Sequence, residues 1–131
     1  MLYNHNDVYV GPSFEHYGEF SEGEVELFRQ IVQPGFLVLD IGANIGAHTL
    51  FFAQAVTNQG SVLAFEPQRI LFQSLCANLA LNSKTNVYCY QAALGEAAGQ
   101  LTVPQFDFTQ VSNYGSLSLD QGLPGESVPV M

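Results

Sequence analysis

The spacing of hydrophobic and polar residues changes along this chain, and each change marks the start of a predicted element. Residues 1–20 show no clear period, and we expect an irregular lead-in there. Residues 21–24, Ser-Glu-Gly-Glu, match a capping box with Ser21 as the N-cap and Glu24 at the third helical position. Apolar side chains then recur at helical spacing, and the Pro-Gly pair at 34–35 ends the predicted helix.

Beyond this helix the pattern changes to short apolar runs separated by helical stretches. The runs are nearly continuous, which is typical of strands buried on both faces of a parallel sheet. They cover residues 36–41, 61–65 and 87–91. Helical patterns at residues 45–56 and 68–81 connect them. This order predicts right-handed crossovers and an α/β fold with a doubly wound, mostly parallel sheet.

The character of the chain changes again after Ala93, where glycine, proline and polar residues dominate. The pattern favours short strands at residues 100–103 and 116–119, and it shows no repeat and no second hydrophobic core. We therefore expect one domain over residues 21–131, preceded by the lead-in of residues 1–20.

The charge balance narrows the range of partners. Twelve acidic residues against three basic ones give a net charge of −9. Arg29, Arg69 and Lys84 lie far apart in the sequence and form no basic stripe, so we expect neither nucleic acid nor an anionic membrane surface as a partner. Charged residues make up 11% of the chain, against about a quarter in ordinary domains, so part of the surface is unusually neutral or is covered.

Two cysteines and the N-terminus complete the composition argument. Cys76 and Cys89 stand singly among apolar residues, and we expect two buried small side chains rather than a disulfide or a metal site. The N-terminus has no basic stretch followed by an apolar segment, and polar residues interrupt the apolar residues 36–56. We expect a cytoplasmic protein without a membrane span.

Two acids and a glycine-bearing turn stand where the predicted strands end. Asp40 closes the first apolar run, Gly42 and Gly46 follow it, and Glu66 closes the second run. Ligands of open parallel sheets bind outside the carboxyl ends of the strands. The glycines let the backbone approach a ligand closely, and the helix after them points free N–H groups at the same crevice. Glu66 is therefore placed to accept hydrogen bonds from two ribose hydroxyls.

Two details distinguish between adenosine-containing cofactors. A dinucleotide fingerprint has glycine where this chain has Asn44, because that position approaches a pyrophosphate. Asp40 would repel a diphosphate but suits a ligand with ammonium and sulfonium charges, so a methionine-type cofactor fits and NAD fits poorly. A P-loop is excluded because no Gly-Lys-Ser/Thr follows. Taken singly, the features also fit a tight turn, a helix N-cap at Asp40 and a solvent-facing strand end at Glu66.

Five segments show a more specific pattern when they are taken together. They are residues 38–49, 64–67 and 92–95, with flanking residues 18–22 and 113–117. From about residue 17 onward the chain resembles the FkbM family of S-adenosylmethionine-dependent methyltransferases. The resemblance implies a Rossmann-like class I methyltransferase fold and methyl transfer, typically to a hydroxyl oxygen on a small-molecule acceptor such as a sugar or polyketide.

The resemblance also implies which residues hold S-adenosylmethionine. The methionine and ribose parts are expected against Asp40, Gly42, Ala43, Asn44 and Gly46. Glu66 is expected to bind the ribose hydroxyls, and the adenine is expected beside Pro67, Gln68, Ala92 and Ala93.

The resemblance assigns no catalytic base. His48 lies within a helical pattern, where a structural role is expected, and His16 with Tyr17 is a candidate for closing over the cofactor. Family members continue after a Val-Pro-Val-like segment into further strands, which would follow Met131. The resemblance thus implies a sheet truncated before those strands.

Two hypotheses follow from this sequence. The chain is the cofactor-binding half of a methyltransferase, or it is a non-catalytic module that needs a partner chain to complete its sheet. That partner is a second copy or another polypeptide, because an unpaired strand edge invites pairing. A nucleotide-binding or NAD-binding module is a weaker third alternative, and Asn44 disfavours it.

Overall fold

Three parallel strands form the main sheet of the molecule. A computed structural model describes residues 1–116 and 124–131. The strands are β1 (Leu37–Ile41), β2 (Ser61–Phe65) and β3 (Val87–Tyr90), hydrogen-bonded in that order. They lie where the three apolar runs predict them, and the α/β class with a parallel sheet is confirmed.

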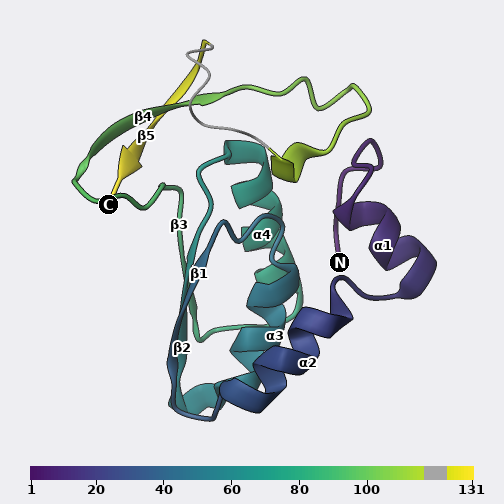
Figure 1. Cartoon of the computed structure of the whole chain (residues 1–131), viewed down its shortest axis with the longest axis vertical. Coiled ribbons are helices and arrows are strands. Elements are labelled where there is room, and N and C mark those ends of the chain that lie inside the picture. The colour runs from purple at the N-terminus through teal and green to yellow at the C-terminus, as the bar shows by residue number, and fades with distance from the viewer. Residues whose placement is uncertain (117–123) are drawn as a thin grey trace.

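Helices cover one face of this sheet (Figure 1). The covering elements are α2 (Glu22–Ile31), α3 (Ala47–Ala55) and α4 (Arg69–Leu81), with a short 3-10 turn, η1 (Thr57–Gln59), after α3. Val62 and Ala64 of β2 point into this layer and are completely buried. Val62 packs against Phe52 and Val56, whereas Ala64 packs against residues of α4. The core therefore lies between the sheet and these helices.

The opposite face of the sheet is open, which corrects the expectation of strands buried on both sides. Leu37, Leu39 and Ile41 of β1 are 53–64% exposed, and Tyr88 of β3 is 55% exposed. Among the described residues no helix lies over this face (Figure 1). The chain therefore supplies one of the two helical layers that a doubly wound sheet has.

The N-terminal lead-in is more ordered than its sequence indicates. Residues 10–17 form helix α1 (Val10–Tyr17), which corrects the expectation of an irregular segment. Val10 belongs to a core cluster with Ile45 and Tyr114, and the backbone of Leu2 exchanges two hydrogen bonds with the Asn78 carboxamide. These packing contacts, rather than helical periodicity, order the segment. The domain boundary at residue 20 stays a prediction.

The first predicted helix begins at the expected residue but not with the expected cap. Ser21 is the N-cap of α2, in a left-handed conformation with φ of 56°. Its hydroxyl donates to the Glu24 carboxylate (2.5 Å) instead of accepting from a backbone N–H, so the capping box does not form. The Glu24 side chain is therefore held at the start of the helix without satisfying its free amides.

A β-hairpin packs against the end of the sheet (Figure 1). It consists of β4 (Gly99–Pro104) and β5 (Gly125–Val130), which pair antiparallel over their full length. The sequence pattern predicts β4 but not β5, whose partner lies far away in the sequence. Tyr114–Ser116 form a 3-10 turn, η2, and the remaining residues of the strand expected at 116–119 lie outside the described part.

None of the helices in the described residues is long and apolar enough to cross a membrane.

Candidate cofactor site

The turn after β1 is bonded directly to the end of β2. The backbone N–H groups of Gly42 and Ala43 both donate to the Phe65 carbonyl, at 2.9 and 3.0 Å. Phe65 immediately precedes Glu66 in the sequence. Because the strands are parallel, Asp40 and Glu66 thus reach the same edge of the sheet, as the sequence predicts.

Three residues of the turn adopt left-handed conformations, which explains its composition. Gly42, Asn44 and Gly46 have φ of 79°, 53° and 92°. Glycine adopts this region freely, and Asn44 is stabilised there because its Oδ1 accepts from the Ile45 N–H at 2.7 Å. A Cβ on Gly46 would lie 2.8 Å from the Leu75 side chain. Gly46 therefore packs closely against α4, and it lines neither of the two cavities described below.

The Glu66 carboxylate is buried and is hydrogen-bonded both to the turn after β1 and to the start of α4. Its Oε2 accepts from the Asn44 N–H at 2.9 Å, and its Oε1 accepts from the Gln68 N–H at 2.8 Å. Burial raises the pKa of Glu66, while the two N–H donors oppose that rise. Each carboxylate oxygen has a further lone pair that these bonds leave available.

Asp40 faces a cavity of about 250 Å³ at the end of β1. Its Oδ2 accepts from the Thr49 hydroxyl at 2.5 Å. Burial raises the pKa of Asp40, and the Thr49 hydrogen bond lowers it to a smaller extent. The lining contains no lysine or arginine; it consists of Tyr9, Val10, Phe20, Asp40, Gly42, Ala43, Asn44, Ala47, His48, Asn113, Gly115 and Ser116.

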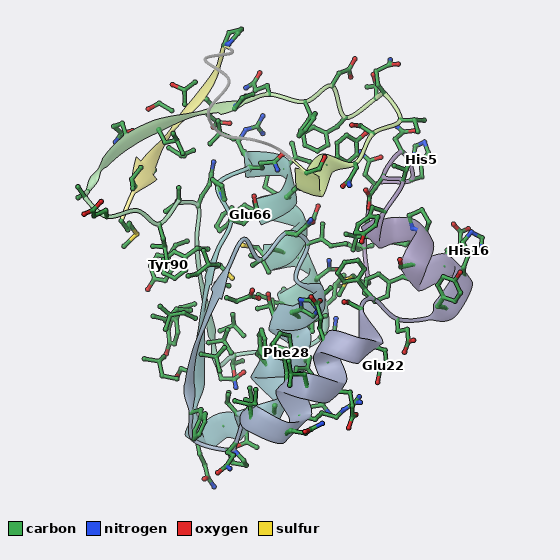
Figure 2. The ribbon with its side chains drawn as sticks, in the orientation of Figure 1. His5, His16, Glu22, Phe28, Glu66 and Tyr90 are labelled. Atoms are coloured by element: carbon green, nitrogen blue, oxygen red, sulfur yellow. The ribbon has the colours of Figure 1, made fainter. Side chains whose placement is uncertain are left out.

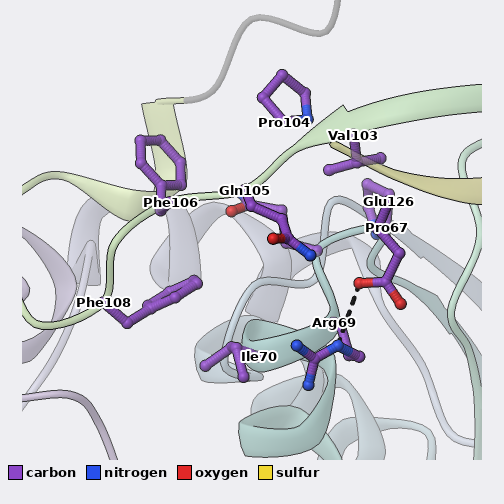
Figure 3. Close-up of a pocket in the computed structure, with 10 residues that line it drawn as sticks. Pro67, Arg69, Ile70, Val103, Pro104, Gln105, Phe106, Phe108 and Glu126 are labelled. Carbon is purple, nitrogen blue, oxygen red and sulfur yellow. Dashed lines mark hydrogen bonds and ion pairs between the residues drawn. The ribbon is translucent and has the colours of Figure 1, made fainter. Parts of the chain in front are cut away.

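A second cavity, of about 170 Å³, opens between the start of α4 and the hairpin (Figure 3). Pro67 and Gln68 line it, together with the aromatic rings of Phe106 and Phe108. An ion pair between Arg69 Nε and a Glu126 carboxylate oxygen, 3.1 Å long, crosses from α4 to β5 at its edge. This cavity offers a mostly apolar wall that a flat heteroaromatic ring could contact.

The sequence pattern indicates no role for the segment Asn113–Ser116, although it matches a family flanking pattern. Three of its residues line the Asp40 cavity, and the fourth, Tyr114, is 1% exposed. Tyr9 and Phe20 complete that wall from the N-terminal part of the chain. The only sequence signal for this wall is the Asn-Tyr-Gly-Ser match, because nothing in the local pattern indicates what the segment packs against.

Four predicted site residues line neither cavity: Gly46, Glu66, Ala92 and Ala93. Ala92 and Ala93 are 2% and 8% exposed. The Ala93 N–H donates to the Pro129 carbonyl, and its carbonyl accepts from the Met131 N–H, both at 3.0 Å. These bonds attach the end of β3 to the hairpin, so the structure gives Ala93 a backbone role in holding β5.

The histidines differ in their distance from the site. His48 borders the Asp40 cavity, where its ring packs against Phe28 and its Nε2 lies 3.5 Å from a Glu24 carboxylate oxygen. His16 lies on α1, away from Glu66 (Figure 2), and neither it nor the 79% exposed Tyr17 lines the Asp40 cavity. Within residues 1–116 and 124–131 no cluster of three acidic, histidine or cysteine side chains could hold a metal.

Comparison with known proteins points in the same direction as this geometry. The model of the FkbM methyltransferase domain matches residues 40–129. The chain is 37% identical over 70 residues to Methyltransferase sdnD of Sordaria araneosa, a match that covers 53% of this chain and 27% of that protein. It is 28% identical over 100 residues to Methyltransferase 1 of Beauveria bassiana, covering 73% of this chain and 40% of that protein.

Solved structures share the fold at low sequence identity. A SAM-dependent O-methyltransferase from Thermotoga maritima aligns with a TM-score of 0.52 and 14% identity, over 74% of this chain and 51% of that one. A SAM-dependent methyltransferase from Aquifex aeolicus aligns with a TM-score of 0.50 and 21% identity, over 61% of this chain and 41% of that one. The chain thus spans about half or less of the proteins that it matches.

Proposed function

We propose that this chain, which belongs to the FkbM methyltransferase family, binds S-adenosylmethionine at the carboxyl ends of β1 and β2 and serves methyl transfer to a small-molecule hydroxyl. One observation supports this most directly. The Glu66 carboxylate accepts hydrogen bonds from Asn44, which lines one cavity, and from Gln68, which lines the other. A ligand with a ribose at its centre and different groups at its two ends matches this arrangement.

The residues at the first cavity fit the charged end of such a cofactor. Asp40 is the acidic side chain there, and no lysine or arginine competes for it. A carboxylate in a partly buried site attracts an ammonium or sulfonium group more strongly than one in water. Gly42 would meet no atom within 4 Å if it had a Cβ, so its backbone is open to the cavity.

The remaining contacts follow the same order. Glu66 would accept hydrogen bonds from the ribose hydroxyls with its free lone pairs, and Pro67 would contact the adenine in the second cavity. Ala43, Asn44 and Gly46 shape the turn that these groups approach. S-adenosylmethionine supplies an electrophilic methyl group when bound, and the chain's own residues hold and orient it.

The acceptor is proposed on the family resemblance. We infer a hydroxyl oxygen of a sugar, a polyketide or a related metabolite. In-line displacement at a methyl carbon depends mainly on the positions of the two reacting groups, with a base assisting deprotonation. We assign no base to this chain, because His48 packs among aromatic rings.

The experiment that tests this proposal is calorimetric binding of S-adenosylhomocysteine, the product form of the cofactor. We expect a Kd on the order of micromolar for the purified chain. Glu66→Ala should weaken binding by at least about tenfold, because the ribose loses its acceptors and the Asn44 and Gln68 amides lose theirs. Glu96→Ala, at an exposed acidic residue outside both cavities, is the matched control. A folded wild-type chain that does not bind would contradict the proposal.

A second candidate function is an assembly module that requires a partner chain. The open, apolar face of the sheet is the observation that favours it. The side chains of β1, β2 and β3 on that face carry no formal charge. We infer that the occupant is a second copy of this chain, since an uncharged surface lets two acidic molecules meet without opposing like charges.

A further inference from the structure

The segment Asn113–Ser116, called the roof from here on, forms part of the wall of the Asp40 cavity. The buried aromatic ring of Tyr114 anchors it. Tyr114 is buried in the core with its ring centroid 4.5 Å from that of Phe108 and 5.6 Å from that of Phe106. Its hydroxyl donates to the Gln110 carbonyl. The neighbours of Tyr114 in the segment are thereby held in the wall of the cavity.

The Gln68 side chain is already engaged by this roof. Its Nε2 donates to the Tyr114 carbonyl at 2.8 Å, across 46 residues of sequence, and the residue is 9% exposed. Its backbone N–H donates to Glu66 at the same time. Gln68 therefore connects the buried carboxylate to the roof, and this amide hydrogen is not free for a ligand.

Gly115 brings the roof into contact with the turn after β1. A Cβ at this position would lie 2.7 Å from Asn44 Nδ2, closer than side chains normally pack. Asn44 cannot simply move aside, because its left-handed backbone and its Oδ1 bond to Ile45 fix its side chain. A side chain larger than glycine at this position would therefore have to displace the Asn44 carboxamide from its bond to Ile45.

These contacts close a ring. Asn44 donates to Glu66, Glu66 accepts from Gln68, and Gln68 donates to Tyr114. The next residue, Gly115, lies so near Asn44 that a Cβ would overlap its side chain. We propose that Gln68 is a positioning residue that seats the roof over the methionine end of the cofactor, instead of contacting the adenine. This inference rests on the proposed function, and it assigns Gln68 a role different from the one that the family resemblance implies.

This ring of contacts predicts which part of a ligand loses affinity when Gln68 is replaced. The roof lines the cavity of Asp40, where the amino-acid part of S-adenosylhomocysteine is proposed to bind. 5′-Methylthioadenosine keeps the adenosine and the sulfur but lacks that part. A loosened roof should therefore weaken S-adenosylhomocysteine more than 5′-methylthioadenosine. A lost adenine contact would weaken both ligands by the same factor.

The test compares the two ligands by calorimetry on wild type and Gln68→Met, which keeps the length of the side chain but removes the donor. We expect S-adenosylhomocysteine to bind about fivefold more weakly, as the loss of one hydrogen bond implies. The affinity for 5′-methylthioadenosine should stay within about twofold. Gly115→Ala should give the same pattern by displacing the roof, and it carries the test if Gln68→Met does not fold. Because Gly115 itself lines the cavity, faster exchange at the Ser116 amide must accompany the pattern to show that the roof has moved. Gly23→Ala, where a Cβ meets nothing within 4 Å, should change neither affinity.

The outcomes separate this inference from the proposed function. Equal weakening of both ligands, or no change in either, would overturn the role of Gln68 while wild-type binding of S-adenosylhomocysteine keeps the proposed function intact. Binding of neither ligand by the wild-type chain would overturn both. Hydrogen exchange at the Ser116 amide gives an independent readout, because a loosened roof should exchange faster in Gln68→Met.

Discussion

The two carboxylates of the site differ in how the chain satisfies them. Glu66 is 4% exposed and accepts two backbone N–H bonds. Asp40 accepts a hydrogen bond from the Thr49 hydroxyl and otherwise faces the cavity. Burial raises the pKa of both groups. Fewer hydrogen-bond donors of the protein stabilise the charge of Asp40 than that of Glu66. A cationic group of a ligand should therefore stabilise Asp40 more than Glu66.

This difference predicts a pH dependence of ligand binding. As the pH falls, Asp40 gains a proton and no longer attracts the ammonium group of S-adenosylhomocysteine, so binding should weaken. Because burial raises the pKa of Asp40 above its ordinary value of 3.8, the loss should begin at a higher pH than for an exposed aspartate. Calorimetry across a series of pH values measures this effect.

Asp40→Asn provides the control for the pH dependence. It should bind about tenfold more weakly at neutral pH and depend less on pH, with the remaining dependence due to Glu66. If wild type and Asp40→Asn followed the same curve with pH, Asp40 would not be the group that senses the ligand charge.

At the scale of elements, the hairpin decides the shape of the second cavity. Val103 of β4 and Glu126 of β5 both line it, and Arg69 of α4 pairs with Glu126 at its edge (Figure 3). The hairpin is held to the sheet by the backbone bonds of Ala93. The strands pair closely at Gly125, where a Cβ would overlap the Val103 carbonyl oxygen.

Gly125→Ala should therefore open the hairpin. The neighbouring atom is part of the backbone and cannot rotate away, so we expect a loss of about 1–3 kcal/mol in the free energy of unfolding. Urea unfolding measures the loss, and faster amide exchange in β4 would localise it. Gly99→Ala lies in the same strand pair but meets no atom within 4 Å. Equal stability of the two variants would show that this approach is not tight.

At the scale of the whole molecule, one face of the sheet remains apolar and open. β1 is an edge strand of the three-stranded sheet, and Leu37, Leu39 and Ile41 project from its open face. A molecule with a net charge of −9 would normally repel a second copy. The open face is free of charged side chains, so that repulsion is weakest there.

We expect the purified chain to self-associate through this face. Leu39→Glu should shift it toward the monomer, because two buried carboxylates would oppose each other across the contact. Light scattering after size-exclusion chromatography measures the change. Leu27→Glu on α2 is the matched control, since Leu27 and Leu39 are both 53% exposed. A wild-type chain that is monomeric and unfolds cooperatively would contradict the expectation.

The sequence by itself determined the strands and helices of the parallel sheet and the acids that end its strands. The periods that identify β1, α3, β2, α4 and β3 are local, since each depends on residues a few positions apart. Parallel pairing then brings Asp40 and Glu66 to one edge without further information. The positive φ at Gly42 and Gly46 also follows from local turn chemistry.

Only the tertiary structure decided what closes the site. β5 forms because residues 125–130 pair with 99–104, and the Gln68 bond to Tyr114 spans 46 residues. α1 is ordered by packing of Val10 against Ile45 and Tyr114. Contacts of this length leave no period in the sequence, because they depend on which surfaces the folded sheet brings together. The roof and the open apolar face are therefore properties of the fold.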